Sequence, residues 1–261
     1  MNDIFFISLI ITVSLIGVFS KNLNTSGGIA AIFIGSLLYF SMEWEGLIIL
    51  GAFFFSSSLW SRFKAHKKGE IERILVKTSR RDWQQVVANG GAAALFGIIY
   101  LYSSTEIWLY AAIASIAAAN SDTWASEIGT LSKKKPLSIR TFHLTERGES
   151  GAISILGTIA GLFGSFFIAS IAFLFIPDID FDLFWFIGLA GFLGNILDTL
   201  LGAFVQIEFH CPKCKRNVEN PVHCSVKTRR IKGFPMFQNE SVNFLSSFFA
   251  GIVIIFMEIC L

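Results

Sequence analysis

Carboxylate side chains occur at two places where long apolar stretches of the sequence end. One is the segment 120–127 (NSDTWASE), and the other is the segment 195–199 (NILDT). An Asp near the centre of a membrane helix costs at least ~2.5–3.5 kcal/mol, so such groups are functional candidates by default. Carboxylate oxygens suit Mg²⁺, which takes one or two carboxylates together with substrate phosphates. The two segments therefore indicate Asp122 and Asp198 as Mg²⁺ ligands, with Glu127 on an adjacent face of the first helix.

Amides and hydroxyls occur at the same level of other apolar stretches. Asn89 follows the start of one stretch, Asn120 precedes Asp122, and Asn243 follows the start of the last stretch. Polar residues also open the second stretch at 25–28 (TSGG) and close the third at 56–58 (SSS). Six helices would thus present oxygen and nitrogen groups at one depth. Helix capping or packing explains any single residue of this kind, but it explains the whole set poorly.

A basic loop, residues 132–150 (SKKKPLSIRTFHLTERGES), precedes a long apolar stretch. The turn 148–151 then stands at the expected N-terminus of a helix, where free backbone N–H groups and the helix dipole favour anions. Basic charge in a cytoplasmic loop, with a Ser or Glu helix cap, explains the loop equally well. The residues expected to bind phosphate there are Lys134, Arg147, Gly148, Ser150 and Gly151.

Three of the four cysteines lie in another basic loop, with the spacing Cys211-x2-Cys214-x8-His223-Cys224. Disulfides are disfavoured in the reducing compartment where this loop is expected to lie. Three thiolates and an imidazole form a tetrahedral donor set, and the C-x2-C half is typical of zinc knuckles. We expect a structural Zn²⁺ site, since four protein ligands leave no open position. Loop cysteines without redox or metal chemistry are the alternative.

The elements that must position these groups are membrane-spanning helices. The chain is 53% hydrophobic and 15% charged, and its mean hydropathy is +0.62. Soluble domains carry roughly 25% charged residues, so a soluble globular enzyme is excluded. A helix that crosses the bilayer needs about 20 apolar residues. We predict an all-α bundle of about eight spans, with six to eight compatible with the sequence, at residues 4–20, 22–42, 46–61, 83–105, 107–121, 150–177, 183–197 (or to 206) and 241–257.

The basic residues are confined to alternate loops of this arrangement. All 21 Lys and Arg residues are Lys21 or lie in loops at about 62–83, 121–150 and 207–240, which eight spans place on one side. The positive-inside rule makes this side cytoplasmic and both termini extracytoplasmic. These loops are too short for an independent core. We therefore predict a single membrane domain over residues 1–261, located in the cell membrane.

Several motifs resemble those of a known family. They are QVVANGG (85–91), NSDTWASEIGTLS (120–132) followed by P-x-x-I-x-T, ERGESGAISILG (146–157), LDTLLGAFVQ (197–206), the Cys-x-x-Cys…His-Cys loop and QNESVN (238–243). Over about residues 25–250 the chain resembles the integral-membrane family that includes the plant phytyl-phosphate kinase. The resemblance implies transfer of a phosphoryl group from CTP or a similar nucleotide to an isoprenoid monophosphate. Glu240 stands where the family pattern has Asp, and the carboxylate is kept.

The chemistry implied by the resemblance fits the polar residues. A prenyl phosphate keeps its tail in lipid and its phosphate at the interface, whereas nucleotides are cytosolic. Phosphoryl transfer requires mainly positioning and charge neutralisation. We therefore expect Asp122, Glu127 and Asp198 to bind Mg²⁺ or to orient the acceptor phosphate, and other polar residues to assist them. Those residues are Asn120 and Asn243 beside the carboxylates, and Asn89 with the basic loop on the phosphates. The expected partners are the bilayer, the isoprenoid phosphate and the nucleotide, and no nucleic acid.

A transporter or lipid flippase is the main alternative, and it would use the same acids as proton or cation sites. Transporter sites usually lie near the bilayer midplane. The depth of Asp122 and Asp198 therefore discriminates, because a place at the cytoplasmic boundary favours the kinase. A structural scaffold leaves the intramembrane carboxylates unexplained.

Overall fold

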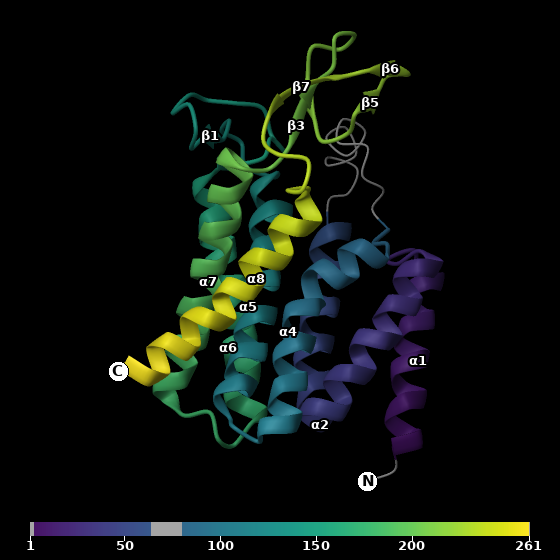
Figure 1. Cartoon of the computed structure of the whole chain (residues 1–261), viewed down its shortest axis with the longest axis vertical. Helices are drawn as coiled ribbons and strands as arrows, with labels where there is room; N and C mark the ends of the chain where they lie inside the picture. Colours follow the sequence, from purple (N-terminus) through teal and green to yellow (C-terminus); the bar gives the residue numbers. More distant parts are fainter. Residues whose placement is uncertain (1–2, 64–79, 261) are drawn as a thin grey trace.

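The computed structural model describes residues 3–63 and 80–260, and these form a helical bundle with short strands at one end (Figure 1). The expected helical membrane bundle is confirmed. Five of the described helices, α2, α4, α6, α7 and α8, are long and apolar enough to cross a membrane. The helices are α1 (Asp3–Phe19), α2 (Thr25–Arg62), α4 (Trp83–Ser103), α5 (Ile107–Gly129), α6 (Ile155–Phe175), α7 (Phe181–Phe204) and α8 (Asn239–Cys260).

Helix α2 consists of two segments that run in opposite directions. The backbone of Glu43 is non-helical, with φ 50° and ψ −141°. The Arg62 guanidinium donates to the carbonyl of Ser20, so the last turn of α2 lies at the same end as its beginning. Gly46 makes the reversal compact, because a Cβ there would lie 2.7 Å from the carbonyl oxygen of Leu38. The two segments correspond to the predicted stretches 22–42 and 46–61.

Helix α5 is the centre of the bundle, and every residue from 109 to 121 is buried. Its many alanines let neighbouring backbones approach closely, as small residues do in membranes. Gly161 and Gly164 of α6 lie against it, since Cβ atoms there would come within 3.3 and 3.1 Å of carbonyl oxygens of α5. The helix also continues to Gly129, so Asp122 and Glu127 are helical rather than part of the predicted loop at 121–150.

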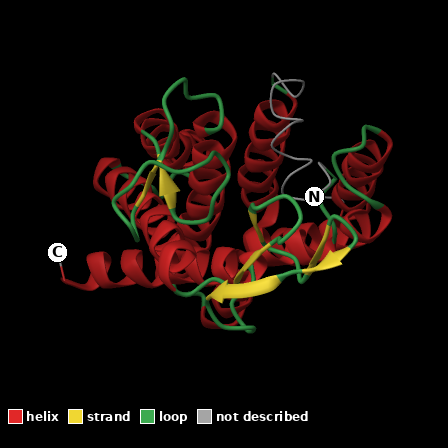
Figure 2. Ribbon diagram, turned by 90° about the horizontal axis from the view of Figure 1, so that it is seen from above, coloured by secondary structure: helices red, strands yellow, loops and turns green. Residues whose placement is uncertain are grey.

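The expectation of an all-α chain omitted short strands at one end of the bundle. β1 (Leu137–Ser138) pairs with β2 (Ala152–Ile153), and residues 207–238, here called the cysteine module, carry two small sheets. One sheet has the order β4-β3-β7 and the other pairs β5 with β6. The module lies over helix ends (Figure 2). Its strands are β3 (Glu208–His210), β4 (Asn217–Val218), β5 (Val222–His223), β6 (Val226–Lys227) and β7 (Arg229–Lys232).

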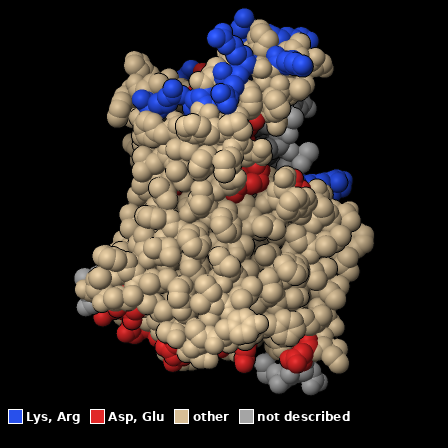
Figure 3. Space-filling model, viewed as in Figure 1, with Lys and Arg blue, Asp and Glu red and all other residues tan. Residues whose placement is uncertain are grey.

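The two ends of the bundle differ in charge (Figure 3). Lys and Arg gather at the end that carries the strands, here called the basic end, whereas the opposite, acidic end shows Asp and Glu and no Lys or Arg in this view. At the acidic end the hydroxyls of Tyr39 and Tyr110 donate to Asp3 and Glu106 at 2.7 and 3.0 Å. The predicted segregation of charge is thus seen in the described residues. Most of the predicted loop at 62–83 lies outside them.

Candidate functional site

Polar side chains from three helices meet near the basic end. We call them the polar cluster: Asn89 of α4, Asp198 of α7, and Asn243 and Ser246 of α8. Ser246 Oγ donates to Asp198 Oδ2 at 3.0 Å, and the Asn243 amide nitrogen donates to the same oxygen at 3.2 Å. The other amide atom of Asn243 lies 3.5 Å from Asn89 Oδ1. Three residues predicted from separate stretches of sequence are therefore neighbours.

The polar cluster lies closer to the basic end than to the middle of its helices. Asp198 is six residues before the end of α7 at Phe204, which is about 9 Å along the helix axis. The midpoint of this 24-residue helix is about 18 Å from its end. Asn89 and Asn243 lie within two turns of the first residues of α4 and α8.

Asn120 of α5 has a different environment from that predicted for a residue at the substrate. It is fully buried. Its Oδ1 accepts from the hydroxyls of Ser56 and Ser57 at 3.0 and 3.3 Å, and its amide nitrogen donates to the carbonyl of Gly164 at 2.7 Å. These bonds join α2, α5 and α6, so Asn120 holds three helices together.

The other two predicted carboxylates lie on the last two turns of α5, and both are partly buried. The hydroxyl of Ser61 donates to Glu127 Oε1 at 2.6 Å. Within the described part of the chain, Asp122, Glu127 and Asp198 do not form a trio compact enough to hold one ion. A Mg²⁺ site of one or two carboxylates completed by substrate phosphates fits this arrangement.

The helix after the basic loop begins later than predicted. The sequence pattern placed its N-terminus at residues 148–151, but α6 begins at Ile155, and Ser154 Oγ accepts from the Gly157 backbone N–H at 3.1 Å. Gly148 and Gly151 have φ values of 84° and 78°, which belong to turns. The helix N-terminus predicted at these residues is therefore wrong, and phosphate binding by the turn stays a prediction.

The turn instead packs against the end of α7. Ser150 Oγ lies 2.9 Å from Gln206 Oε1, to which it donates. A Cβ at Gly151 would lie 2.3 Å from the Cα of Ala203, so only glycine fits there. The predicted cationic partners, Lys134 and Arg147, are exposed on the outer part of the loop.

The four predicted zinc ligands come together. The ligand atoms of Cys211, Cys214, His223 and Cys224 all lie within 4.8 Å of one another. His223 Nδ1 is 3.5 Å from Cys214 Sγ and 3.3 Å from Cys224 Sγ. In residues 3–63 and 80–260 this is the one group of three or more such side chains with that geometry. A compact set of three sulfurs and one nitrogen fits tetrahedral Zn²⁺.

The backbone around these ligands adopts uncommon conformations. Cys224 and Ser225, at the tip of the β5–β6 hairpin, have φ values of 52° and 60°, and Lys215 after Cys214 has 59°. Residues other than glycine hold such conformations where their surroundings fix them. A hydrogen bond from the Cys214 backbone N–H lowers the pKa of Cys211 to about 6. The thiolate, which is the form that binds metals, is therefore favoured at Cys211.

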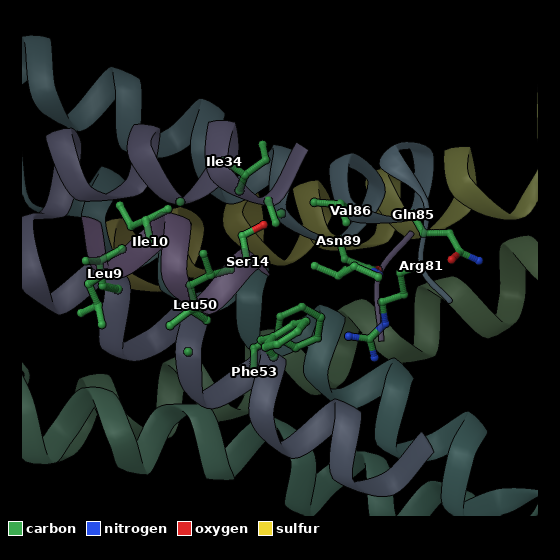
Figure 4. A pocket seen from close by; sticks show the side chains of 18 residues that line it. Leu9, Ile10, Ser14, Ile34, Leu50, Phe53, Arg81, Gln85, Val86 and Asn89 are labelled. Atoms are coloured by element: carbon green, nitrogen blue, oxygen red, sulfur yellow. The ribbon is translucent and has the colours of Figure 1, made fainter. Parts of the chain in front are cut away.

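Arg81 was not among the predicted site residues, and Gln85 was identified only as part of the motif at 85–91. Gln85 precedes Asn89 by four residues and shares its face of α4, whereas Arg81 lies before the helix, whose N-cap is Asp82. The sequence does not distinguish Arg81 from the other basic residues of the predicted loop at 62–83. The guanidinium carbon of Arg81 lies 5.8 Å from the centroid of the Phe53 ring. All three residues line an apolar cavity between α1, α2 and α4 (Figure 4).

A second cavity, here called the polar pocket, lies between the first turns of α4 and α8 and the cysteine module. Its volume is about 460 Å³. Asp82, Glu219 and Glu240 contribute carboxylates and Arg80 contributes a guanidinium. Gln85 lines both this pocket and the apolar cavity, so the two spaces adjoin at its side chain.

Comparisons with known proteins agree with the motifs. Residues 8–251 match the family described as integral membrane protein DUF92. An uncharacterized membrane protein of Methanocaldococcus jannaschii is 37% identical over 188 residues, which is 72% of this chain and 76% of that protein. Protein PGR of Arabidopsis thaliana is 29% identical over 87% of this chain and 85% of its own length. Protein VTE6, chloroplastic, of the same plant is 26% identical over 90% of this chain and 65% of its own length. No solved structure matches the chain significantly.

Proposed function

The chain belongs to the DUF92 family of integral membrane proteins, and from this premise we propose that it is a membrane-embedded kinase of isoprenoid monophosphates. An oxygen of the lipid phosphate attacks the terminal phosphorus of CTP or a similar nucleotide. The bond from that phosphorus to the nucleotide's bridging oxygen breaks. The products are an isoprenoid diphosphate and a nucleoside diphosphate.

The depth of the polar cluster carries this proposal. Asp198 is about 9 Å from the end of its helix, at the level where a lipid phosphate and a water-soluble nucleotide meet. A transporter site is expected near the midplane. The adjoining polar pocket and apolar cavity give the two substrates separate approaches to this level.

The chemistry assigned to the residues is positioning and charge neutralisation, which dominate phosphoryl transfer. Asp198 and Asp122 are the proposed Mg²⁺ ligands, and Mg²⁺ supplies positive charge to the phosphates when bound. Ser246 and Asn243 donate to Asp198 and so fix its orientation. Glu127 accepts a hydrogen bond from Ser61 near the same end of the bundle. An acceptor phosphate is already ionised, so no general base is required.

The proposed topology has eight spans, with the two segments of α2 counted separately. The basic end then faces the cytoplasm by the positive-inside rule, and both termini lie outside. The nucleotide reaches the polar pocket directly from the cytosol in this orientation.

We further propose that the cysteine module holds a structural Zn²⁺. Cys211→Ser should abolish bound zinc, which is one ion per chain in the wild type, because three remaining ligands bind Zn²⁺ weakly. Metal content of purified protein measures this. Cys260→Ser is the control, since Cys260 is exposed on α8 outside the module. Unchanged zinc in Cys211→Ser, or a wild type without zinc, would contradict the site.

The function is tested with purified protein in lipid nanodiscs. The protein is incubated with Mg²⁺, CTP or ATP, and phytyl, geranylgeranyl or longer prenyl monophosphates. The expected result is an isoprenoid diphosphate with at least one pair of substrates. Absence of the diphosphate with every pair, together with movement of prenyl phosphate across vesicles that contain the protein, would favour the transporter instead.

A further inference from the structure

The cavity between α1, α2 and α4 is apolar along most of its length and polar at one end. Its volume is about 160 Å³. Leucine, isoleucine and phenylalanine side chains form its walls. Arg81, Gln85 and Asn89 lie together at its polar end (Figure 4). Representative wall residues are Leu9, Ile10, Ile34, Leu50 and Phe53.

The polar end of the cavity coincides with the basic end of the bundle. The backbone of Arg81 exchanges hydrogen bonds with Asn22 and Asn24, which connect α1 to α2, at 2.9 and 3.0 Å. At the other end of the cavity, Leu9 is ten residues before the last residue of α1, which is about 15 Å along its axis. The cavity therefore extends from the expected interface toward the middle of the bilayer.

The cavity is open on its side. Leu9 and Val13 are 41% and 42% exposed. Gly51 on the facing segment of α2 is also exposed. In the described part of the chain, no heavy atom beyond Gly51, its two chain neighbours and the adjacent helix backbone lies within 4 Å of the position that a Cβ at Gly51 would take. A molecule in the bilayer can thus enter between α1 and α2.

Charge and amide groups at the polar end complement a phosphate. A guanidinium binds phosphate oxygens through several N–H donors, and the amides of Gln85 and Asn89 add donors. Asn89 also belongs to the polar cluster, and Gln85 also lines the polar pocket. A phosphate bound by Arg81, Gln85 and Asn89 would therefore lie beside both the polar cluster and the polar pocket.

We propose that this cavity binds the acceptor lipid, with the isoprenoid chain between α1 and α2 and its monophosphate at Arg81. This inference rests on the proposed function for the identity of the lipid. It adds the location of the acceptor, its lateral entry from the bilayer, and Arg81 as the residue that binds its phosphate.

The location is tested by binding, without turnover. A geranylgeranyl monophosphate with a photoreactive diazirine near the chain end should label peptides from residues 3–19 and 25–62. Gly51→Leu places a side chain in the opening and should reduce labelling at least about ten-fold. Leu59→Phe is the matched control, because it adds bulk to an exposed position of α2 outside the cavity. Equal labelling of both variants, or labelling elsewhere, would overturn the location.

The role of Arg81 is tested by comparing two ligands. Arg81→Gln should weaken binding of geranylgeranyl monophosphate at least about ten-fold and leave binding of geranylgeraniol unchanged. Arg81→Lys keeps the charge and should retain part of the affinity. Equal effects on both ligands would contradict a phosphate contact. Labelling of the cavity without diphosphate formation would support the location and refute the kinase. Diphosphate formation with labelling elsewhere would support the kinase and refute the location.

Discussion

Asp198→Asn is expected to lower the rate of phosphoryl transfer at least about 100-fold while the protein stays folded. The substitution removes the negative charge that binds Mg²⁺ but keeps the size of the side chain. Ser246 can still donate to the remaining carbonyl oxygen, so helices α7 and α8 stay joined. Initial rates with saturating Mg²⁺ and nucleotide measure the effect, and the thermal unfolding midpoint shows that the fold is retained.

Asp182→Asn is the matched control for this experiment. Asp182 is in the first turn of the same helix, at the acidic end, and its side chain is exposed. Its replacement should leave the rate within about two-fold of wild type, since a distant exposed charge contributes little. A near-normal rate in Asp198→Asn would refute the assignment of Asp198. Equal losses in both variants would show that the loss does not arise at the polar cluster.

Lys232→Met is expected to destabilise the cysteine module by about 3–5 kcal/mol. Lys232 Nζ lies 3.4 Å from Glu208 Oε2, and these side chains are 6% and 7% exposed. The same nitrogen donates to the carbonyl of Gly202 at 2.9 Å and so connects the module to α7. Without Lys232 the buried carboxylate loses its partner. Hydrogen exchange in residues 207–238 should accelerate, and the thermal midpoint should fall.

The destabilisation by Lys232→Met should depend on pH. Burial already raises the pKa of Glu208 in the folded protein, and loss of Lys232 removes the charge that opposes this shift. The penalty applies to the ionised carboxylate, so it is full above the pKa of Glu208 in the folded variant and is lost progressively as the pH falls from there to the pKa of Glu208 in the folded wild type. Glu208→Gln in the Lys232→Met background should therefore restore stability at neutral pH. Lys227→Met, at an exposed position of the same module, is the control, and an equal effect there would contradict the prediction.

Hydropathy and charge predicted which stretches form helices, because both are properties of local sequence, but the end of α5 and the start of α6 differed from the prediction. The positions that differed depend on competing local conformations. At the start of α6, Ser154 rather than the glycine-containing turn caps the helix, and either cap is compatible with the pattern. At Glu43, the non-helical residue joins two spans without a loop, and this reversal depends on the close approach of Gly46 to the preceding segment.

The candidate site was only partly predictable, because residue type and depth can be read along the chain but contacts between helices cannot. Asp198, Asn243 and Asn89 were identified by residue type and depth, and these properties can be read along the chain. Depth alone did not separate Asn120, whose bonds to two serines and a carbonyl give it a packing role. The cavity at Arg81 requires the relative positions of three helices, which one sequence does not contain.

The central claim is tested most directly by transfer of label from the terminal phosphate of CTP or ATP to a prenyl monophosphate in the presence of Mg²⁺. The predicted result is labelled isoprenoid diphosphate and one nucleoside diphosphate per lipid product. Wild-type protein should form it, whereas Asp198→Asn should form almost none. Label that never enters the lipid with any nucleotide and prenyl phosphate, from folded wild-type protein, would contradict the account.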